Sequence, residues 1–360
     1  MSGTGPGVGI LGGGFMGAVH SRAVRAARGR LVAVAGSSPE SGERAAAALG
    51  IERAAPDVDA VIAASDVDVV HVCTPNAVHA DQALRAIAAG KHVVCEKPLA
   101  TTVSDARAVA DAAEAAGVVG AVPFVYRYHP IVRHARALVQ QGELGTILTI
   151  DGAYLQDWLA AASETNWRAD AAAGGASRAF ADIGSHLCDL LEFVTGDRIR
   201  ALSARTRTVY AERDGATVAN EDIAALVVEL AGGGLGTLLV TQLAPGRKNG
   251  LVLEVHGTER SVRFEQEDPE RLWIGQRDGS QLILRDPGLI GDRGLSIVPS
   301  GHPMGYQDAF NAFIADAYAA AAGETPDGLP TFADGVRAAE LTAAVLESAR
   351  TGAWIDVPAI

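Results

Sequence analysis

The sequence predicts a two-domain protein: a doubly wound parallel α/β domain over residues 1–125, then an α+β domain with a large, mostly antiparallel sheet over residues 126–360. Three observations predict it. The chain has 360 residues, more than one typical domain holds. In the first part, short apolar runs alternate with alanine-rich helical stretches, as in parallel strands joined by crossover helices. In the second part, longer strand-like runs follow one another directly, which favours antiparallel pairing.

The elements expected in the first domain follow its apolar periodicity. The expected strands are Val8–Leu11, Leu31–Ala35, Val69–Cys73, His92–Cys95 and Val118–Val122. The expected helices are Phe15–Ala27, Pro39–Leu49, His79–Ala89 and Ser104–Ala116. Crossover connections of this kind place helices on both faces of a parallel sheet.

The second domain begins with a helix over Val132–Gln141, ended by Gly142. The expected strands are Ile147–Leu155, Ile199–Tyr210, Ile223–Leu230, Leu235–Leu243 and Leu251–His256. The turn Ala231-Gly-Gly-Gly makes the third and fourth of them antiparallel neighbours. Closing helices are expected over Tyr306–Ala322 and Asp334–Thr351, and the region 306–351 is a candidate to pack back on the first domain. The Gly- and Pro-rich stretch 279–304 is expected to be the most mobile loop.

Composition excludes several classes of protein. The net charge of −13 disfavours nucleic acid and anionic membranes as partners. The three cysteines are widely spaced, which argues against a disulfide framework or zinc site and fits a reducing compartment. The apolar N-terminus lacks a basic segment and is interrupted by glycines, so we read it as a strand and not as a signal peptide. We therefore expect a cytoplasmic protein with no membrane span.

The first strand is followed by Gly12-Gly13-Gly14-Phe15-Met16-Gly17, which fits the Gly-x-Gly-x-x-Gly turn of dinucleotide-binding domains. Gly12 would permit the tight turn, and Gly14 would let the backbone approach a pyrophosphate. Gly17 would let the helix pack closely on the strand, and the helix N-terminus would meet the negative charge. The pattern alone is weak, but a strand before it and a helix after it predict a dinucleotide site.

The end of the second strand reads Gly36-Ser37-Ser38, where an NAD site usually has an acidic residue for the ribose hydroxyls. No carboxylate stands there to repel a 2′-phosphate, and both serine hydroxyls can donate to one. The alternative is a plain Ser-Pro turn in which Ser38 caps the next helix. The choice between NAD and NADP stays open, with a slight preference for NADP.

Further short motifs resemble those of one family. Thr74-Pro75-Asn76 and Glu96-Lys97-Pro98 each follow an expected strand, and Gly174-Gly175 and Asp182-Ile183-Gly184-Ser185-His186 come later. Together with the glycine turn, and in this order, they make the whole chain resemble the Gfo/Idh/MocA oxidoreductases, which include glucose-fructose oxidoreductase and inositol dehydrogenases.

The resemblance implies residue roles. In that family the Lys-Pro peptide is typically cis, and Lys97 would face the nicotinamide and hydrogen-bond the reacting hydroxyl. His186 would be the acid/base, and Asp182 would orient His186 or the substrate. Alcohol oxidation needs a base for the hydroxyl proton, and an ammonium stabilises the developing alkoxide. The expected cofactor contacts are Gly12, Gly14, Phe15, Met16, Gly17, Ser37, Ser38, Thr74, Pro75, Asn76, His79, Glu96 and Lys97.

These residues also have simpler interpretations. A lysine before proline is common in surface turns, and Asp182 and His186, at i and i+4, would also suit a helix-surface pair. As metal ligands they lack an evident third and fourth partner, so we predict no metal site.

Segments around two tryptophans resemble the sugar-oxidising members, including levoglucosan-dehydrogenase-like sequences. Trp158 and Trp167 would stack on a sugar face, with Asp157 or Arg168 binding hydroxyls, although core packing explains both tryptophans equally well. Arg178 lies in an extra segment before Asp182 and is either a substrate contact or a solvated loop arginine. The expected substrate contacts are Tyr126, Arg127, Trp158, Trp167, Arg168 and Tyr306.

The sequence thus predicts an NAD- or NADP-dependent dehydrogenase or reductase for a secondary alcohol of a sugar, cyclitol or related polyol. The rivals are a dihydrodiol dehydrogenase or imine-type reductase on the same scaffold, and a non-catalytic NAD(P)-sensing regulator. Retention of both Lys97 and His186 argues against the regulator. The strand Ile223–Leu230 is apolar on both faces, which predicts a homodimer or homotetramer packed through the sheet.

Overall fold

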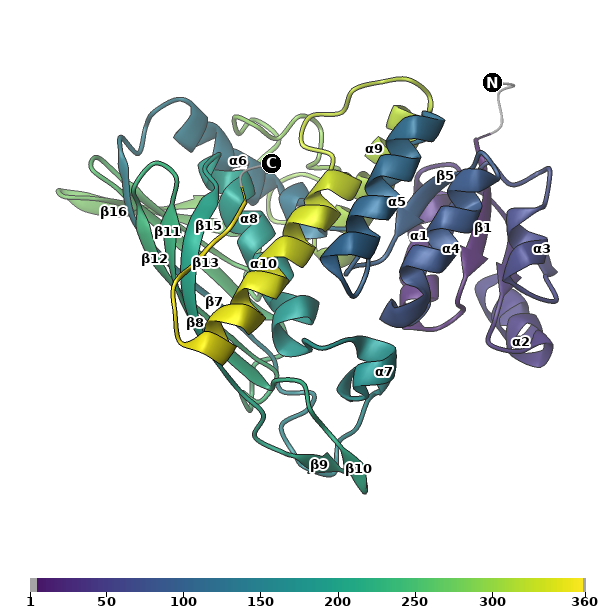
Figure 1. The fold of residues 1–360 in the computed structure, drawn as a ribbon. Helices are drawn as coiled ribbons and strands as arrows, with labels where there is room; N and C mark the ends of the chain where they lie inside the picture. The colour runs from purple at the N-terminus through teal and green to yellow at the C-terminus, as the bar shows by residue number, and fades with distance from the viewer. Residues whose placement is uncertain (1–4, 359–360) are drawn as a thin grey trace. The chain divides into compact units, whose positions relative to one another are not determined.

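The computed structural model describes residues 5–358, and the chain divides into two compact units (Figure 1). Unit 1 contains the described residues up to Val125 together with Tyr306–Val336. Unit 2 contains Tyr126–Gly305 together with the described residues from Arg337 onward.

Unit 1 is built on a six-stranded parallel sheet in the order β3-β2-β1-β4-β5-β6. Its strands are β1 (Gly7–Leu11), β2 (Arg30–Ala35), β3 (Arg53–Ala54), β4 (Val69–Val72), β5 (His92–Cys95) and β6 (Gly120–Ala121). Its helices are α1 (Phe15–Ala26), α2 (Pro39–Leu49), α3 (Val58–Ile62), α4 (His79–Ala88), α5 (Val103–Ala116) and α9 (Tyr306–Ala321). The strand order reverses beside β1, and in open α/β sheets ligands bind where this reversal occurs, at the carboxyl ends of the strands.

The parallel α/β fold predicted for this region is confirmed, with local corrections. The last strand covers only Gly120–Ala121 where Val118–Val122 was expected, and β3 and α3 were not predicted. Helix α9, distant in sequence, lies along α1: Gln307 Nε2 donates to the carbonyl of Val19 at 3.2 Å, and the Phe310 ring packs edge-on against His20.

Unit 2 contains a nine-stranded sheet in the order β16-β15-β14-β13-β7-β12-β11-β8-β17. Its strands are β7 (Ile147–Leu155), β8 (Ile199–Arg207), β11 (Ile223–Leu230), β12 (Leu235–Thr241), β13 (Gly250–Gly257), β14 (Ser261–Glu265), β15 (Arg271–Gln276), β16 (Gly279–Leu284) and β17 (Ile355–Asp356). The pairing of β7 with β12 is parallel, and the other pairings in this sheet are antiparallel. A separate two-stranded hairpin joins β9 (Glu212–Arg213) to β10 (Ala216–Thr217).

Helices α6 (Pro130–Gln140), α7 (Ala171–Gly174) and α8 (Ser185–Thr195) belong to unit 2, and α10 (Phe332–Thr351) enters it from Arg337. Helix α8 contacts β7 and β13, and α6 contacts β14 and β15, so both cover one face of the sheet. The mostly antiparallel sheet and the predicted pairing of β11 with β12 are confirmed. The stretch 279–304 was expected to be a mobile loop, but Gly279–Leu284 forms β16, because its backbone pairs with β15 at the sheet edge.

Strand β11 buries one face and exposes the other within the single chain. Leu226 and Val228 point inward and are buried, whereas Val227 is 42% exposed. On the neighbouring strand β12, Leu235 and Leu239 are 52% and 42% exposed. No helix among residues 5–358 combines the length and apolarity needed to cross a bilayer.

Candidate functional site

The glycine turn of unit 1 has the geometry that a dinucleotide requires. Gly12 has a φ of +95°, and a side chain on it would collide with the carbonyl of Cys73 at 2.6 Å. A Cβ on Gly17 would come within 2.3 Å of the carbonyl of Gly12, so this glycine lets α1 start close to β1. Gly14 precedes α1, and nothing lies within 4 Å of where its Cβ would be. The open backbone at the helix N-terminus therefore fits a pyrophosphate.

The two side chains that follow Gly14 differ in accessibility. Phe15 is 76% exposed, whereas Met16 is half-buried. The exposed Phe15 offers an apolar surface beside the open backbone of the turn.

The three residues that follow β2 differ in accessibility. A Cβ on Gly36 would lie 2.5 Å from the backbone nitrogen of Gly42, because the start of α2 packs directly against it. Ser38 caps α2, since its Oγ accepts a hydrogen bond from the Ser41 amide at 3.3 Å. Ser37 is exposed. The capping role proposed for Ser38 is thus present, and Ser37 is the residue of this turn that is accessible to a ribose or phosphate.

Two loops at the carboxyl edge of the parallel sheet are joined by His79. Its Nδ1 lies 2.8 Å from the carbonyl of Pro98, and its Nε2 lies 2.7 Å from the carbonyl of Thr74. The ring is fully buried, and burial lowers its pKa. The Thr74 hydroxyl also donates to Gln82 Oε1 at 2.6 Å. His79 therefore ties the turn after β4 to the segment after β5, and Thr74, Pro75 and Asn76 are held at this edge.

Glu96 is buried at the end of a hydrogen-bonded chain inside unit 1. Tyr318 Oη lies 3.0 Å from His71 Nε2, His71 Nδ1 lies 2.8 Å from His20 Nδ1, and His20 Nε2 lies 3.0 Å from Glu96 Oε1. All three contacts are satisfied with both rings neutral if each group donates toward Glu96. Burial, and then the nearby His20, lower the pKa of His71 well below its ordinary value, which keeps that ring neutral.

This chain of hydrogen bonds holds Glu96, the residue before Lys97, in place. Burial alone would raise the pKa of the Glu96 carboxyl, but the hydrogen bond from His20 and the neighbouring Lys97 and His79 outweigh it and lower that pKa. The Lys97–Pro98 peptide is cis, as the resemblance implies. Lys97 itself is half-buried.

In unit 2, His186 lies on the first turn of α8 and is buried among aromatic side chains. The ring of Tyr126 meets it edge-on with centroids 5.1 Å apart, and the ring of Tyr154 lies 6.5 Å away. The hydroxyls of Tyr126 and Tyr154 are in contact at 2.5 Å, and Tyr154 Oη also donates to Asn249 Oδ1 at 2.5 Å. Burial raises the pKa of Tyr126, so this phenol remains neutral at ordinary pH.

Asp182 lies one turn before His186 on a π-helical segment, Phe180–Gly184, that leads into α8. Wide turns of this kind often occur at functional sites. One carboxylate oxygen, Oδ1, accepts from Arg168 Nε at 3.2 Å, and the other, Oδ2, accepts from Gln242 Nε2 at 2.8 Å. Two donors on opposite oxygens hold this carboxylate in one orientation.

The two tryptophans are half-buried and thus neither core residues nor fully exposed ones. Trp158 Nε1 donates to Gln156 Oε1 at 2.7 Å, and the Arg168 guanidinium lies over the Trp167 ring at 4.4 Å. Asp157 is held by Lys248 Nζ at 2.6 Å and by the Gly246 amide at 3.0 Å. Trp167, Arg168 and Asp182 therefore form one continuous group within unit 2.

Other expected residues have structural partners. Arg127 is buried, forms an ion pair with Asp189 and lies over the Phe193 ring. Tyr306 packs against Phe310 within α9. Arg178 was expected to be a substrate contact or a solvated loop arginine, and the structure supports neither, because this side chain is fully buried against Asp222.

Sequence reasoning missed Gln242, Tyr154 and Asn249 as members of the group around Asp182 and His186. Tyr154 was part of a quoted segment, but its role depends on a contact with Tyr126, 28 residues away. Gln242 lies 60 residues from Asp182, at the end of a strand whose pattern shows only burial. No local signal in the sequence marks either contact.

Each of the two units contains a region that matches a known protein family model. Residues 7–124 match the model of an oxidoreductase family described as having an NAD-binding Rossmann fold, and residues 132–263 match the GFO/IDH/MocA C-terminal domain. The levoglucosan dehydrogenase of Pseudarthrobacter phenanthrenivorans is 33% identical over 387 aligned positions, which cover 98% of each protein.

Solved structures are similar over almost the whole chain. An oxidoreductase domain protein from Kribbella flavida is 37% identical, with a TM-score of 0.93 and coverage of 99% of this chain and 100% of that one. A levoglucosan dehydrogenase solved in complex with NADH and levoglucosan is 34% identical, with the same TM-score of 0.93 and coverage of 99% and 100%.

Proposed function

Because the chain belongs to the Gfo/Idh/MocA oxidoreductase family, we propose that it is an NAD(P)-dependent dehydrogenase acting on a secondary alcohol of a sugar, cyclitol or related polyol. The observation that carries the proposal is the combination of an open glycine turn with a buried histidine, His186, preceded by a doubly held carboxylate, Asp182. A cofactor-sensing regulator needs the turn but has no use for the proton-transfer residues.

Each catalytic side chain has a proposed role in alcohol oxidation. When bound at the glycine turn, the nicotinamide cofactor would supply the hydride acceptor. His186 takes the hydroxyl proton, a role that histidine fills more often than any other side chain. The Lys97 ammonium stabilises negative charge on the substrate oxygen. Asp182, as a fixed carboxylate, orients His186 or holds a neighbouring substrate hydroxyl. Lys97→Ala is expected to remove most activity. Lys97→Arg should retain little of it, because a planar guanidinium does not replace a compact ammonium.

The proposed substrate is a compact sugar, and levoglucosan is the first to test, since the relative that aligns over 98% of this chain is a levoglucosan dehydrogenase. Trp158 and Trp167 are half-exposed and offer aromatic faces to the apolar side of a sugar ring. Arg168 bridges Trp167 and Asp182 and can also donate to a hydroxyl.

The test is an initial-rate assay of the purified protein with levoglucosan, other anhydrosugars, aldoses and inositols, each with NAD and with NADP. Cofactor reduction with at least one polyol supports the proposal. A folded protein that binds NADH yet reduces neither cofactor with any polyol would overturn it in favour of a sensor.

For the cofactor, we propose that both NAD and NADP are accepted, with NADP at least as good. The support is the absence of a carboxylate among Gly36, Ser37 and Ser38, since such a carboxylate would repel a 2′-phosphate. No arginine stands directly at the end of β2 to grip that phosphate, so the preference should be modest.

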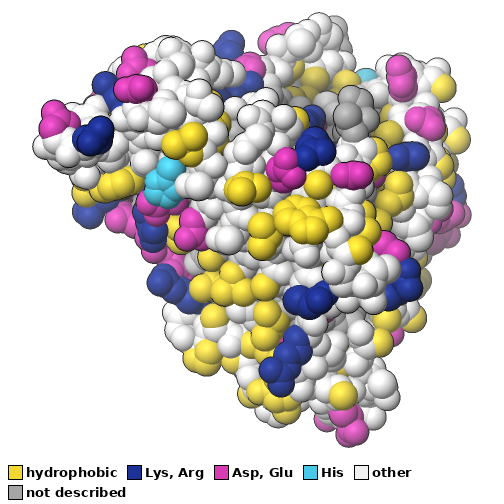
Figure 2. Space-filling model, turned by 60° about the vertical axis from the view of Figure 1, so that its left-hand side comes forward, with side chains coloured by type: hydrophobic (Ala, Val, Ile, Leu, Met, Phe, Trp, Pro, Cys, Tyr) yellow, Lys and Arg dark blue, Asp and Glu magenta, His cyan; other side chains and the backbone are white. Residues whose placement is uncertain are grey.

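We also propose that the chain forms a homodimer or homotetramer through the outer face of the nine-stranded sheet. Val227, Leu235 and Leu239 lie on this face with between 42% and 52% of their surface exposed. Figure 2 shows hydrophobic side chains gathered in patches between charged ones. The combined variant Val227→Glu, Leu239→Glu should be monomeric by light scattering, and a wild-type protein that is strictly monomeric at micromolar concentration would contradict the proposal.

A further inference from the structure

Gln242 follows directly after β12 and is fully buried in unit 2. Its side-chain amide has two different environments. Nε2 donates to Asp182 Oδ2 at 2.8 Å, whereas Oε1 is buried with no hydrogen-bond partner among the described residues. Rotating the amide would bring Oε1 against the carboxylate, where two acceptors repel each other. The orientation is therefore set by Asp182, and it leaves a buried acceptor unsatisfied, which is costly and calls for a functional reason.

The main chain of Gln242 is hydrogen-bonded to two other segments of unit 2, at Leu159 and at Asp222. Its carbonyl accepts from the Leu159 amide at 3.3 Å, and the Leu159 carbonyl accepts from Arg213 Nη2 at 2.9 Å. Its own amide points to the carbonyl of Asp222 at 3.4 Å. Gln242 thus lies between the loop that carries Trp158 and the segment that carries Asp222.

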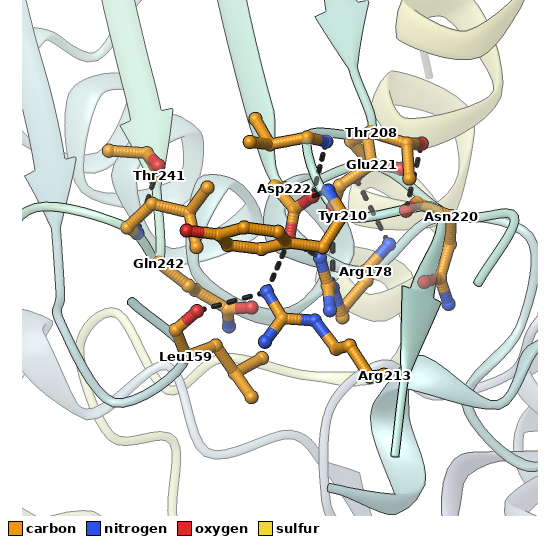
Figure 3. Close-up of polar contacts among 12 residues, drawn as sticks. Leu159, Arg178, Thr208, Tyr210, Arg213, Asn220, Glu221, Asp222, Thr241 and Gln242 are labelled. Carbon is orange, nitrogen blue, oxygen red and sulfur yellow. Dashed lines mark hydrogen bonds and ion pairs between the residues drawn. The ribbon is translucent and has the colours of Figure 1, made fainter. Parts of the chain in front are cut away.

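Asp222 is the centre of this region (Figure 3). Its Oδ1 accepts from both Arg178 and Arg213, and all three side chains are buried, with at most 1% of any of them exposed. Its Oδ2 accepts from the amides of Val209 and Tyr210. One carboxylate therefore connects the extra segment before Asp182, the β9–β10 hairpin and residues 209–210, which follow β8.

The second donor to Asp182 is held by the same network. Asn220 Nδ2 donates to the carbonyl of Arg168 at 2.8 Å, so the position of Arg168 depends on the loop that precedes Asp222. Both donors to Asp182 are thus hydrogen-bonded to the 220–222 segment, Arg168 through Asn220 and Gln242 through Asp222. Such support keeps a site group within a fraction of an ångström of its working position.

We propose that Gln242 is a positioning residue for the dehydrogenase reaction: it fixes the Asp182 carboxylate from the side opposite Arg168, and the network around Asp222 holds Gln242 in place. This inference rests on the proposed function. It assigns Asp182 a defined orientation before substrate arrives, with its two oxygens held by two part-buried hydrogen bonds.

Two variants separate this role from packing. Gln242→Met keeps the size of the side chain and removes the donor, and it should lower kcat by roughly 10–100-fold while leaving the Kd of NADH unchanged. Gln242→Glu keeps the shape and places a second carboxyl beside Asp182. Since two neighbouring carboxylates resist ionising together, the acid limb of the kcat–pH profile should move to higher pH.

The control is Gln276→Met, the same substitution at a half-buried glutamine at the end of β15, which should keep wild-type kcat and pH profile. Folded Gln242 variants with wild-type kcat and an unshifted profile would overturn the inference, as would an equal loss of NADH binding and turnover. If Gln242→Met does not fold, the pH profile of Gln242→Glu decides. A wild-type protein inactive on every polyol would remove the proposed function itself, whereas an active enzyme indifferent to residue 242 would remove only this inference.

Discussion

Unit 1 buries histidines in hydrogen-bonded contacts, whereas unit 2 buries arginines against carboxylates. His20, His71 and His79 of unit 1 are all fully buried, and each of them has partners at both ring nitrogens. In unit 2, Arg178 and Arg213 share Asp222, and Arg337 pairs with Glu192 at 2.8 Å. A neutral ring costs little to bury when both nitrogens are paired, but a buried charge needs its counter-charge in place.

The difference fits the proposed function, in which unit 1 binds the cofactor and unit 2 binds the polyol. A dinucleotide is the same molecule for every enzyme that uses it, and unit 1 meets it with glycines and a helix N-terminus, mostly through backbone. A polyol must be distinguished by its hydroxyl pattern, which requires side chains fixed in direction. We therefore expect substitutions at the glycine turn and at the end of β2 to change cofactor use, and substitutions in unit 2 to change turnover and stability.

The largest effect should come from His186→Ala. Loss of the acid/base should lower kcat by roughly 10²–10⁴-fold, about 3–5 kcal/mol, with the Kd of NADH nearly unchanged because the glycine turn is in unit 1. Steady-state kinetics and a fluorescence titration with NADH measure the two quantities. Near-normal turnover of this variant on a verified substrate would show that His186 is not the acid/base.

Asp222→Ala should be the most destabilising of the single changes considered for unit 2. It leaves Arg178 and Arg213 buried without their shared carboxylate, at a cost of about 3–5 kcal/mol in the free energy of unfolding. The control is Asp66→Ala, which breaks an exposed pair with Arg53 and should cost less than about 1 kcal/mol. Urea unfolding measures the loss of unfolding free energy in both variants. Equal losses would contradict the claim that the buried arginines of unit 2 depend on their carboxylate.

Unit 2 also buries a histidine, His129, which should make the free energy of unfolding depend on pH in the acid range. Burial lowers the pKa of His129 from 6.5 to about 4. The unfolded chain therefore binds one more proton than the folded one between these values. The contribution of the neutral His129 ring to the free energy of unfolding is complete above pH 6.5 and is lost as the pH falls through about 4. It amounts to about 3 kcal/mol. Unfolding free energies measured across this window should fall less steeply for His129→Gln than for the wild type, and parallel slopes would contradict the assignment.

The smallest effect concerns cofactor choice. Ser37→Asp places a carboxylate at the exposed position after β2, and it should shift the ratio of kcat/KM values toward NAD by at least about tenfold, or 1.4 kcal/mol. Gly36 is unsuitable for this test, because a Cβ there would lie 2.5 Å from the Gly42 nitrogen. Ser37→Ala is the matched control. An unchanged ratio in Ser37→Asp would mean that another residue contacts the ribose.

The sequence predicts best those elements whose stabilising interactions lie close together along the chain. The strands and helices around the glycine turn were placed within a few residues, since strand, turn and helix signals are adjacent there. Strand β16 was mistaken for a mobile loop, because Gly279–Leu284 is held by pairing with β15 and not by a pattern of its own.

Candidate site residues could be named from the sequence where a motif is contiguous, whereas contacts between distant segments could not. Lys97, Asp182 and His186 stand in short recognisable segments. Arg178 was misjudged because its partner Asp222 is 44 residues away, and no spacing rule connects the two. The buried chain behind Glu96 reaches Tyr318, which is 247 residues from His71, so only the fold brings it together.

The central claim is that this protein oxidises a secondary alcohol by hydride transfer to a nicotinamide cofactor. The most direct test supplies the wild-type enzyme with levoglucosan, or with the best polyol of the panel, deuterated at its secondary carbinol carbons, and measures the mass of the reduced cofactor. We predict that the reduced cofactor gains one deuterium from the substrate and that His186→Ala slows this transfer by roughly 10²–10⁴-fold. Absence of deuterium in the cofactor with every polyol tested, from a folded protein that binds NADH, would contradict the account.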